Sequence, residues 1–321
     1  MIVTVTLNPG VDRTLTVPAI VFNEVMRATS VQLDWGGKGF NVARALRALG
    51  EDALAMGFVG GATGQMLARG LAQEGVATDL TPIEGESRTN IVIVPEGRAD
   101  LYLGVNEAGP MVSGIEAAAF LERVRQRVRP SDIWVLSGRL PPGMPMGFYG
   151  QLVTLLQADG ARVFLDASGE ALRLGCAAGP YLVKPNLIEA AHIMRAEGEN
   201  LQRQAGEARV TDPGITADEA ADFLLTHGVA LAAISLGAEG LLLASQVERV
   251  RAKPPEVVAA NPVGAGDALL AGLAYALARG CDLADMARWG VAAGTASAMR
   301  AGVSFGTLAE VRAVYDEVVL I

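Results

Sequence analysis

A glycine-rich turn followed by an aspartate carries the strongest chemical signal in this sequence. Within residues 261–272, Asn-Pro-Val-Gly-Ala-Gly-Asp-Ala-Leu-Leu-Ala-Gly, a helix is predicted to begin at Gly264, Ala265 and Gly266. The first amides of a helix lack internal partners and point along the positive end of its dipole, so such a turn binds anions. Asp267 could then act as general base for a hydroxyl that attacks a phosphate. The alternative is that Asp267 only caps the helix.

A second glycine-rich block, Gly-Gly-Lys-Gly-Phe-Asn at residues 36–41, runs into a helical pattern over 43–49. Its candidate ligand-binding residues are Gly37, Lys38, Gly39 and Asn41. Lys38 and the backbone amides could bind an anion, and Asn41 could bind hydroxyls. The block is not a P-loop, because glycine follows the lysine, and it lacks the spacing of a dinucleotide fingerprint. Taken alone, it is equally typical of a plain turn.

Further polar groups follow predicted strands. Asp12 could accept hydrogen bonds from sugar hydroxyls or form an Asx turn. In Lys-Pro-Asn-Leu-Ile-Glu at 184–189, Asn186 and Glu189 either cap a helix or hold the waters of a Mg²⁺ ion. The segment 235–240 is typical of a hairpin turn. A run of small residues at 292–297 either packs helices closely or forms a flat slot for a purine.

The elements that position these groups alternate along the chain. Helical patterns such as Ile115–Val128 and Thr216–His227 accompany short apolar strands such as Arg162–Asp166 and Ala230–Ser235. This alternation predicts a parallel sheet with helices on both faces. Ligands of such sheets bind at the carboxyl ends of the strands, so the polar groups that follow strands are expected to gather there.

The first hundred or so residues also contain short β-rich segments that alternate only partly and are separated by Gly, Pro and charged turns. These are Val11–Val17, Ser30–Leu33, Thr89–Pro95 and Asp100–Val105. They predict a small antiparallel sheet inserted into the α/β body in two pieces, at about 11–35 and 86–106. Because such a sheet cannot bury both faces alone, it should cover a cleft or another subunit. A polar, aperiodic segment at 197–215 is expected to be a surface excursion.

Composition excludes several classes of partner. The net charge of −9 over 321 residues argues against a nucleic-acid surface and requires locally placed cations for any anionic substrate. Two cysteines and two histidines without metal-type spacing argue against a disulfide framework and a transition-metal site. Neither a signal-type segment nor an apolar run of bilayer length is present, so we expect a cytoplasmic protein that binds no membrane.

In order and spacing, these motifs resemble the ribokinase-like (PfkB) family of carbohydrate kinases over essentially the whole chain. The Gly-Gly-Lys-Gly-x-Asn and Gly-Ala-Gly-Asp blocks are the most specific matches. Asn-Pro-x-x-Asp at 8–12, Arg-Thr-Asn at 88–90 and Lys-Pro-Asn-x-x-Glu at 184–189 are similar to the phosphosugar branch, the 1-phosphofructokinase and tagatose-6-phosphate kinase type. The resemblance implies one kinase domain over 1–321, with a three-layer α/β/α fold, a mostly parallel sheet and a small β-sheet lid.

The resemblance also implies a role for each matching position. Asp267 is similar to the catalytic base, and the anion hole would consist of Gly264, Ala265 and Gly266. The sugar-binding positions are Asp12, Gly37, Gly39 and Asn41. Candidate cations for the phosphate that the substrate already carries are Arg27, Lys38, Arg88 and Arg139. The nucleotide side comprises Lys184, Asn186, Ser235, Gly237, Gly240 and the small residue Ala293, and the Mg²⁺-associated pair is Asn186 with Glu189.

The expected activity is phosphorylation, by ATP with Mg²⁺, of a primary hydroxyl on a ketohexose monophosphate. Fructose-1-phosphate, fructose-6-phosphate and tagatose-6-phosphate all remain open. One alternative is a kinase for an unphosphorylated sugar or nucleoside, against which the arginines Arg27, Arg88 and Arg139 count. Another is a non-catalytic sugar-phosphate sensor, against which the intact turn at 264–267 counts. The lid sheet would also suit a homodimer contact.

Overall fold

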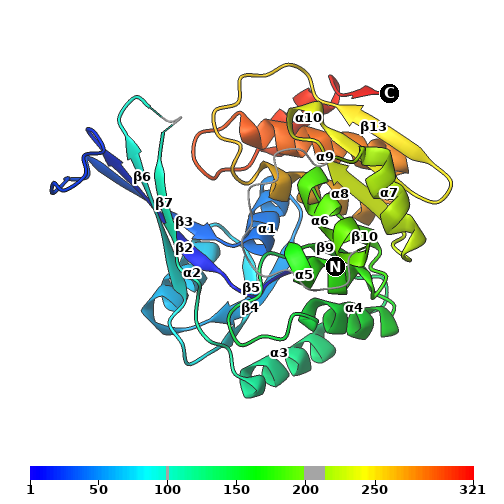
Figure 1. The fold of residues 1–321 in the computed structure, drawn as a ribbon, viewed down its shortest axis with the longest axis horizontal. Coiled ribbons are helices and arrows are strands. Elements are labelled where there is room, and N and C mark those ends of the chain that lie inside the picture. Colours follow the sequence, from blue (N-terminus) through cyan, green and yellow to red (C-terminus); the bar gives the residue numbers. More distant parts are fainter. Residues whose placement is uncertain (99–100, 199–213) are drawn as a thin grey trace.

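A ten-stranded sheet with strand order β14-β13-β12-β11-β10-β9-β8-β1-β4-β5 forms the centre of the body (Figure 1). This computed structural model describes residues 1–98, 101–198 and 214–321, and the strand count refers to these residues. The polar segment predicted at 197–215 lies almost entirely outside them. In this order, every neighbouring pair between β11 and β5 is parallel. The pairs β11–β12, β12–β13 and β13–β14 are antiparallel. The strands are β1 (Ile2–Thr6), β4 (Ala53–Val59), β5 (Ala77–Pro82), β8 (Ile133–Ser137), β9 (Arg162–Asp166), β10 (Leu182–Val183), β11 (Leu231–Ser235), β12 (Leu241–Ala244), β13 (Arg249–Lys253) and β14 (Val319–Leu320).

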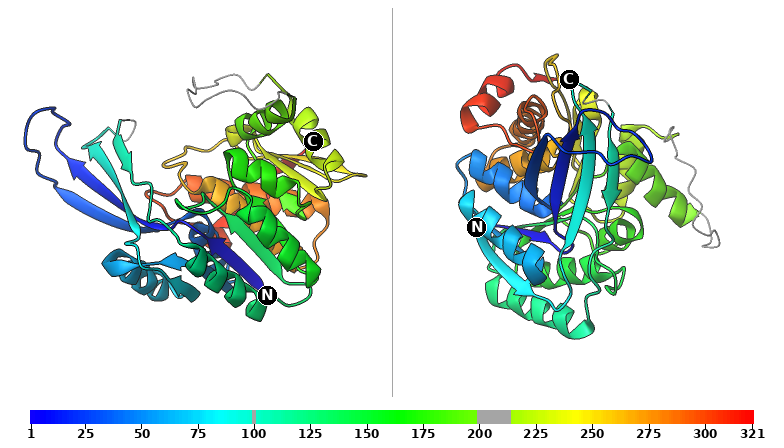
Figure 2. Two further views of the ribbon diagram at one scale, coloured as in Figure 1. Left: turned by 60° about the horizontal axis from the view of Figure 1, so that its bottom comes forward. Right: turned by 90° about the vertical axis from the view of Figure 1, so that its left-hand side faces the viewer.

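Helices cover both faces of this sheet, as Figure 2 shows from two further directions. Strand side chains alternate between two cores: Ile133 and Val135 enter one, and Trp134 and Leu136 enter the other. This arrangement confirms the predicted α/β fold. In the described part of the chain, no helix is both long and apolar enough to span a bilayer. The helices are α1 (Lys38–Ala48), α2 (Gly61–Gln73), α3 (Gly114–Arg127), α4 (Phe148–Ala158), α5 (Gly169–Cys176), α6 (Leu187–Gly198), α7 (Ala217–Thr226), α8 (Ala265–Ala278), α9 (Leu283–Ala298) and α10 (Leu308–Tyr315).

A separate four-stranded sheet, the lid, stands beside the body (Figure 1). Its strand order is β3-β2-β6-β7, and its strands are β2 (Gly10–Val17), β3 (Ser30–Gly36), β6 (Arg88–Pro95) and β7 (Leu103–Asn106). The lid is therefore built from two pieces of the chain, as the sequence predicts. The prediction that it is wholly antiparallel is wrong, because β2 and β6 pair in parallel. Both strands continue from parallel strands of the body, β1 and β5, and so leave it in the same direction.

Helix α1 begins at Lys38, earlier than the helical pattern at 43–49 predicts. Gly37 precedes it with φ of 130°, a conformation that side chains with a Cβ rarely adopt. A Cβ on Gly39 would lie 2.5 Å from the carbonyl oxygen of Val5. The two glycines therefore let the helix start directly against the end of β1, which brings Lys38 and Asn41 to the carboxyl edge of the sheet.

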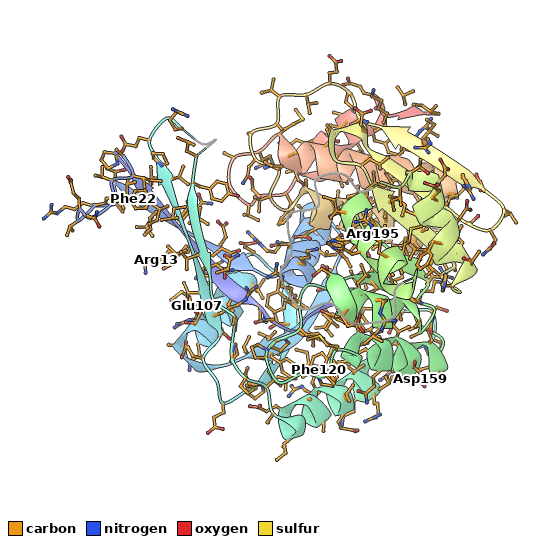
Figure 3. The ribbon with its side chains drawn as sticks, in the orientation of Figure 1. Arg13, Phe22, Glu107, Phe120, Asp159 and Arg195 are labelled. Atoms are coloured by element: carbon orange, nitrogen blue, oxygen red, sulfur yellow. The ribbon has the colours of Figure 1, made fainter. Side chains whose placement is uncertain are left out.

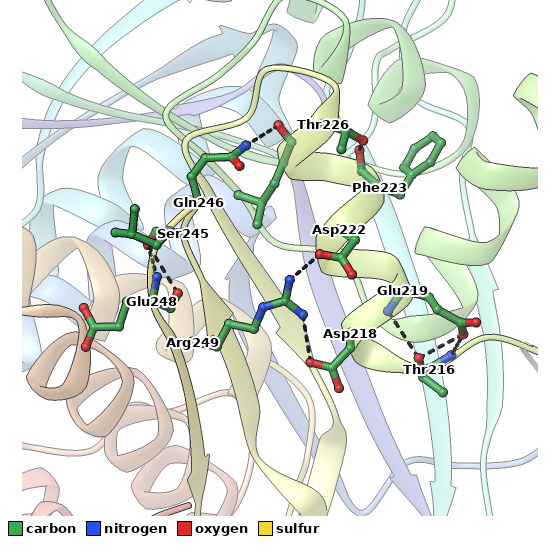
Figure 4. Close-up of polar contacts among 12 residues, drawn as sticks. Thr216, Asp218, Glu219, Asp222, Phe223, Thr226, Ser245, Gln246, Glu248 and Arg249 are labelled. Carbon is green, nitrogen blue, oxygen red and sulfur yellow. Dashed lines mark hydrogen bonds and ion pairs between the residues drawn. The ribbon is translucent and has the colours of Figure 1, made fainter.

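Polar contacts attach α7 to the antiparallel end of the sheet (Figure 4). Thr216 and Glu219 form a reciprocal capping box at the start of α7. Arg249 on β13 forms ion pairs with Asp218 and Asp222 on the same helix. These ion pairs are exposed, so each contributes little to stability.

Candidate active site

Asp267 lies in the first turn of α8, behind Gly264, whose φ of 84° gives the left-handed turn that starts the helix. The Asp267 carboxylate is buried and accepts a hydrogen bond of 2.8 Å from the side-chain amide of Asn41 on α1. The N-cap residue of α8 is Gly264, which has no side chain to cap the helix. Asp267 therefore has a partner on another helix, instead of the capping role that was its alternative interpretation.

Two lysines and a second buried aspartate surround this carboxylate. Asp166, at the end of β9, lies 3.1 Å from the Nζ of Lys38 and 3.4 Å from the Nζ of Lys184. A Cβ built on Gly266 would lie 3.7 Å from the Nζ of Lys184, so this ammonium is beside the amino end of α8. The backbone amide of Ala265, predicted to be part of the anion hole, donates to the carbonyl oxygen of Pro262 at 3.2 Å. The cluster places two cations and a helix amino end around one point, an arrangement that stabilises a transferring phosphoryl group.

The pKa values in this cluster move in opposite directions. Burial, reinforced by the charge of Asp166, raises the pKa of Asp267 to about 6, against the opposing effects of Lys38, Asn41 and Lys184. Burial also acts to raise the pKa of Asp166, but the charges of Lys184 and Lys38 outweigh it and lower that pKa. Burial disfavours charge on Lys38, yet its acidic neighbours raise its pKa to about 12. Asp267 is thus the carboxyl suited to take a proton near neutral pH.

The face of the lid that is turned toward the body carries the next group of polar side chains. Asp12 accepts a hydrogen bond of 2.6 Å from Asn90 on the neighbouring strand β6. Burial raises the pKa of Asp12, against the effects of Asn90, Arg88 and Arg44. A Cβ on Gly36 would collide with the Asp12 carboxylate, so this glycine leaves it room. Asn90 belongs to the Arg-Thr-Asn motif at 88–90, but the sequence predicted no role for it.

Two arginines provide positive charge near this group. Arg88 donates to the backbone carbonyl of Asn8 at 3.1 Å and to the Asn90 side chain at 3.3 Å. Burial lowers the pKa of Arg88, and the charge of Arg139 contributes, while Asp12 and Glu107 oppose them. Arg139 is exposed and lies close enough to influence Arg88. Two neighbouring guanidinium groups of this kind favour a bound anion.

Arg27 lies apart from Arg88. It is exposed in the loop between β2 and β3, which forms the outer tip of the lid in Figures 1 and 2. The sequence correctly placed Arg27 on the lid. Arg88 pairs with Gly10 at the opposite end of β2 from this loop, so the hairpin carries Arg27 away from Arg88.

A cleft of about 780 Å³ lies on the other side of the anion hole. It extends over α9 and the β11–β12 turn, and its wall includes the predicted nucleotide-side residues Asn186, Ser235, Gly237 and Gly240 together with Ala265 and Gly266. Ala293 is placed differently: it is buried in the core. Helix α9 presents Val291, Gly294, Thr295 and Ala298 to the cleft. From the predicted run of small residues at 292–297, Gly294 and Thr295 therefore line the cleft, in place of Ala293.

Asn186 and Glu189 form a reciprocal capping pair at the start of α6. The backbone N–H of Asn186 donates to the Glu189 carboxylate at 2.9 Å, and the backbone N–H of Glu189 donates to the side-chain Oδ1 of Asn186 at the same distance. Over the residues that the structure describes, no three His, Cys, Asp or Glu side chains form a metal cluster. These oxygen donors fit an ion that keeps its waters and is held mainly by phosphates, as Mg²⁺ commonly is.

A second pocket, of about 550 Å³, lies where the lid joins the body. Four carboxylates line it: Glu84, Glu86, Glu107 and Glu116. Its negative character makes it unsuitable for a sugar phosphate or a nucleotide. The cations around Asp267 and the two arginines are therefore the better candidates for binding an anion.

Asp166 is a site residue whose role the sequence did not predict. The signal was available, because an aspartate that ends an apolar strand of a parallel sheet lies at the ligand-binding edge. What the sequence could not show is that Lys38, 128 residues earlier, donates to it.

Comparison with known proteins agrees with this geometry. Residues 3–309 match the pfkB family of carbohydrate kinases. The chain is 38% identical over 292 residues to a 1-phosphofructokinase of Rhodobacter capsulatus, covering 89% of this chain and 87% of that protein. The structure of phosphofructokinase-2 from Escherichia coli in complex with potassium superposes with a TM-score of 0.88 at 30% identity, covering 98% of both chains.

Other solved structures concern a more distant protein of the same fold and further forms of the Escherichia coli phosphofructokinase-2. A ribokinase from Thermotoga maritima superposes with a TM-score of 0.76 at 18% identity, covering 98% of this chain and 99% of that one, which shows the shared fold. The Escherichia coli phosphofructokinase-2 has also been solved with fructose-6-phosphate and as a tetrameric inhibited form.

Proposed function

The chain belongs to the pfkB family of carbohydrate kinases, and from this premise we propose that it phosphorylates a fructose phosphate at a primary hydroxyl. The 38% identity to a 1-phosphofructokinase and the similarity to phosphofructokinase-2 support this substrate class. The observation that carries the chemistry is the buried Asp267 at the amino end of α8, held beside Lys38, Asp166 and Lys184. Fructose-1-phosphate is the first candidate, and fructose-6-phosphate and tagatose-6-phosphate are the others.

In this proposal Asp267 removes the proton of the attacking hydroxyl. The backbone amides of Gly264 and Gly266, with Lys184 beside them, stabilise negative charge on the phosphoryl group as it moves. ATP binds in the cleft over α9 and the β11–β12 turn. Mg²⁺ would be held by the ATP phosphates and, through water, by Asn186 and Glu189, and would neutralise phosphate charge.

The sugar phosphate binds between the lid and the carboxyl edge of the sheet. Asp12, Asn41 and the backbone at Gly37 and Gly39 bind its hydroxyls. Its existing phosphate binds Arg88 and Arg139, the pair of cations on that side of the site. An unphosphorylated sugar would leave these guanidinium groups without an anionic partner, so a phosphorylated substrate is the better fit.

Measurement of ADP release with fructose-1-phosphate, fructose-6-phosphate, tagatose-6-phosphate, fructose and ribose tests the substrate class. We expect turnover with one of the phosphates and little with the free sugars.

Asp267→Asn should lower kcat by about 10²–10⁴-fold with little change in ATP affinity, because it removes the base and keeps the size of the side chain. Arg139→Ala should raise KM for the sugar phosphate but not for ATP. Preference for ribose, or near-normal turnover of the Asp267 variant, would refute the proposal.

We also propose that two chains associate through the outer face of the lid. Cross-strand partners on this face are apolar: Leu33 and Ile91 flank Arg13, and Val31 and Ile93 flank Leu15. Leu103 and Val105 on β7 extend the same face. Arg13 lies on the side of the lid that faces away from α1 (Figure 3). The tetrameric form of the Escherichia coli relative supports association of subunits in this family.

A further inference from the structure

Arg44 is a buried charge with no role in the mechanism above. It lies on α1, one turn after Asn41, with 8% of its surface exposed. Its Nε and Nη2 bond the carboxylate of Glu74, at the end of α2, at 2.6 and 3.0 Å. Nη2 also donates to the backbone carbonyl of Val303 at 3.3 Å, in the loop after α9. A charge is buried in this way only when several partners compensate its lost hydration.

Two further contacts fix the guanidinium group. Asp34 on the lid strand β3 lies 4.0 Å from Nη2, and the Phe305 ring lies 5.3 Å from the guanidinium carbon. Arg44 is thus held by groups from α2, the lid and the loop after α9. Because these partners lie on several sides, the guanidinium group has little freedom to turn away from its remaining neighbour.

That neighbour is Asn41. Nη1 of Arg44 donates to Asn41 Oδ1 at 3.4 Å, and Asn41 Nδ2 donates to Asp267 Oδ2 at 2.8 Å. A guanidinium group can only donate hydrogen bonds, and an ionised carboxylate can only accept them. The amide between them therefore has one orientation that satisfies both, with its oxygen toward Arg44 and its NH₂ toward Asp267.

We propose that Arg44 is a positioning residue that fixes the Asn41 amide with its NH₂ directed at the catalytic base. The base is Asp267 of the proposed function, on which this inference rests. Arg44 does not touch either substrate site in this arrangement and acts through Asn41. Without it, the amide can rotate and present its oxygen to the carboxylate, which repels the ionised form.

This rotation has a defined electrostatic consequence. The charged groups that face Asp267 are Lys38 on α1, Asp166 at the end of β9 and Lys184 after β10, and none of them changes when Arg44 is removed. Only the hydrogen bond from Asn41 is lost, and this bond lowers the pKa of Asp267. Removal of Arg44 should therefore raise that pKa and move the acid limb of the kcat profile to higher pH.

The test compares Arg44→Met and Arg44→Lys with the control Glu74→Gln. ¹³C NMR of the Asp267 carboxyl, assigned with Asp267→Asn, gives its titration directly, and kcat is measured against pH in parallel. We expect both titrations of Arg44→Met to move up by about half a pH unit or more. Arg44→Lys, which keeps the buried charge, should move in the same direction by less. Glu74→Gln should lower the melting temperature without moving either titration.

A double-mutant cycle then separates positioning from general destabilisation. If Arg44 acts through Asn41, Arg44→Met should produce no further shift of the carboxyl titration in an Asn41→Ala background. An unshifted titration in Arg44→Met, or an equal shift in both backgrounds, would overturn the inference. The NMR titration needs no turnover, so it tests Arg44 even if an active Asp267→Asn enzyme overturns the proposed function.

Discussion

At the scale of single residues, the site depends on one carboxyl group whose environment opposes its ionisation. Asp267 is buried and close to a second carboxylate, Asp166, and two lysines and an amide compensate only part of this effect. A base of this kind is stronger than an exposed aspartate, and it is still ionised at neutral pH. The same arrangement predicts how activity and stability depend on pH.

The acid limb of kcat should have an apparent pKa near 6, because Asp267 must be ionised to accept a proton and its pKa is raised to about 6. Below that pH, kcat should fall about tenfold for each pH unit. A pH profile of kcat at saturating substrates checks this. Activity that stays constant down to the ordinary pKa of aspartate would contradict the assigned environment.

Asp267→Asn should make the folded protein more stable at neutral pH while it abolishes most turnover. Raising a carboxyl pKa from 3.8 to about 6 corresponds to a stability loss on the order of 3 kcal/mol when the group is ionised in both the folded and the unfolded state. The asparagine avoids this loss, and the gain should be full above about pH 6 and vanish as the pH falls toward 4. Denaturant unfolding at pH 7.5 and pH 4.5 measures it, and an equal effect at both values would contradict this account.

At the scale of elements, the close packing of α8 on α9 holds the catalytic turn in place. A Cβ on Gly272 in α8 would collide with the backbone carbonyl of Trp289 in α9. Helix α8 carries Asp267 at its start, and α9 lines the proposed nucleotide cleft. Any separation of the two helices would therefore move the base and the cleft relative to each other.

Gly272→Ala should lower the free energy of unfolding by about 1–3 kcal/mol through overpacking against this carbonyl. Its matched control is Gly114→Ala at the start of α3, where a Cβ would meet nothing within 4 Å. That change should be neutral or stabilise by less than about 1 kcal/mol. Chemical denaturation of both variants checks the difference, and equal stabilities would show that the helices can separate without cost.

At the scale of the whole molecule, the lid gives the structure two distinct faces. One carries Asp12 and Asn90 toward the body, and the other presents apolar side chains away from it. Val31 on the edge strand β3 and Val105 on the opposite edge strand β7 are 52% and 58% exposed, a high exposure for apolar residues on one sheet face. A second lid would bury them.

Leu33→Asp should weaken association through the lid, because it would have to bury a charge on this face when a second lid covers it. Light scattering coupled to size-exclusion chromatography should show a dimer for the parent protein and a shift toward the monomer for the variant. Ile115→Asp on α3, where the side chain is 84% exposed and is not part of the lid sheet, is the control and should leave the mass unchanged. A parent protein that is monomeric at high concentration would refute the lid contact.

The sequence by itself determined the fold class, the family and the positions of the glycine-rich turns. These features follow from local rules: side-chain periodicity specifies strands and helices, and glycine specifies turns with positive φ. It also indicated that Asn186 and Glu189 cap a helix, because a capping pair depends on residues three apart. Local patterns likewise identified the two-piece lid, but not the parallel pairing of β2 with β6.

Only the tertiary structure decided which groups act on one another. Asn41 and Asp267 are 226 residues apart, and Lys38 and Asp166 are 128 apart, yet both pairs are hydrogen-bonded. It also buried Ala293, placed Arg27 at the lid tip and enclosed Arg44 among several elements. The physical reason is that pKa, burial and hydrogen-bond partners depend on distances in space, which are set by how the sheet brings remote strand ends to one edge.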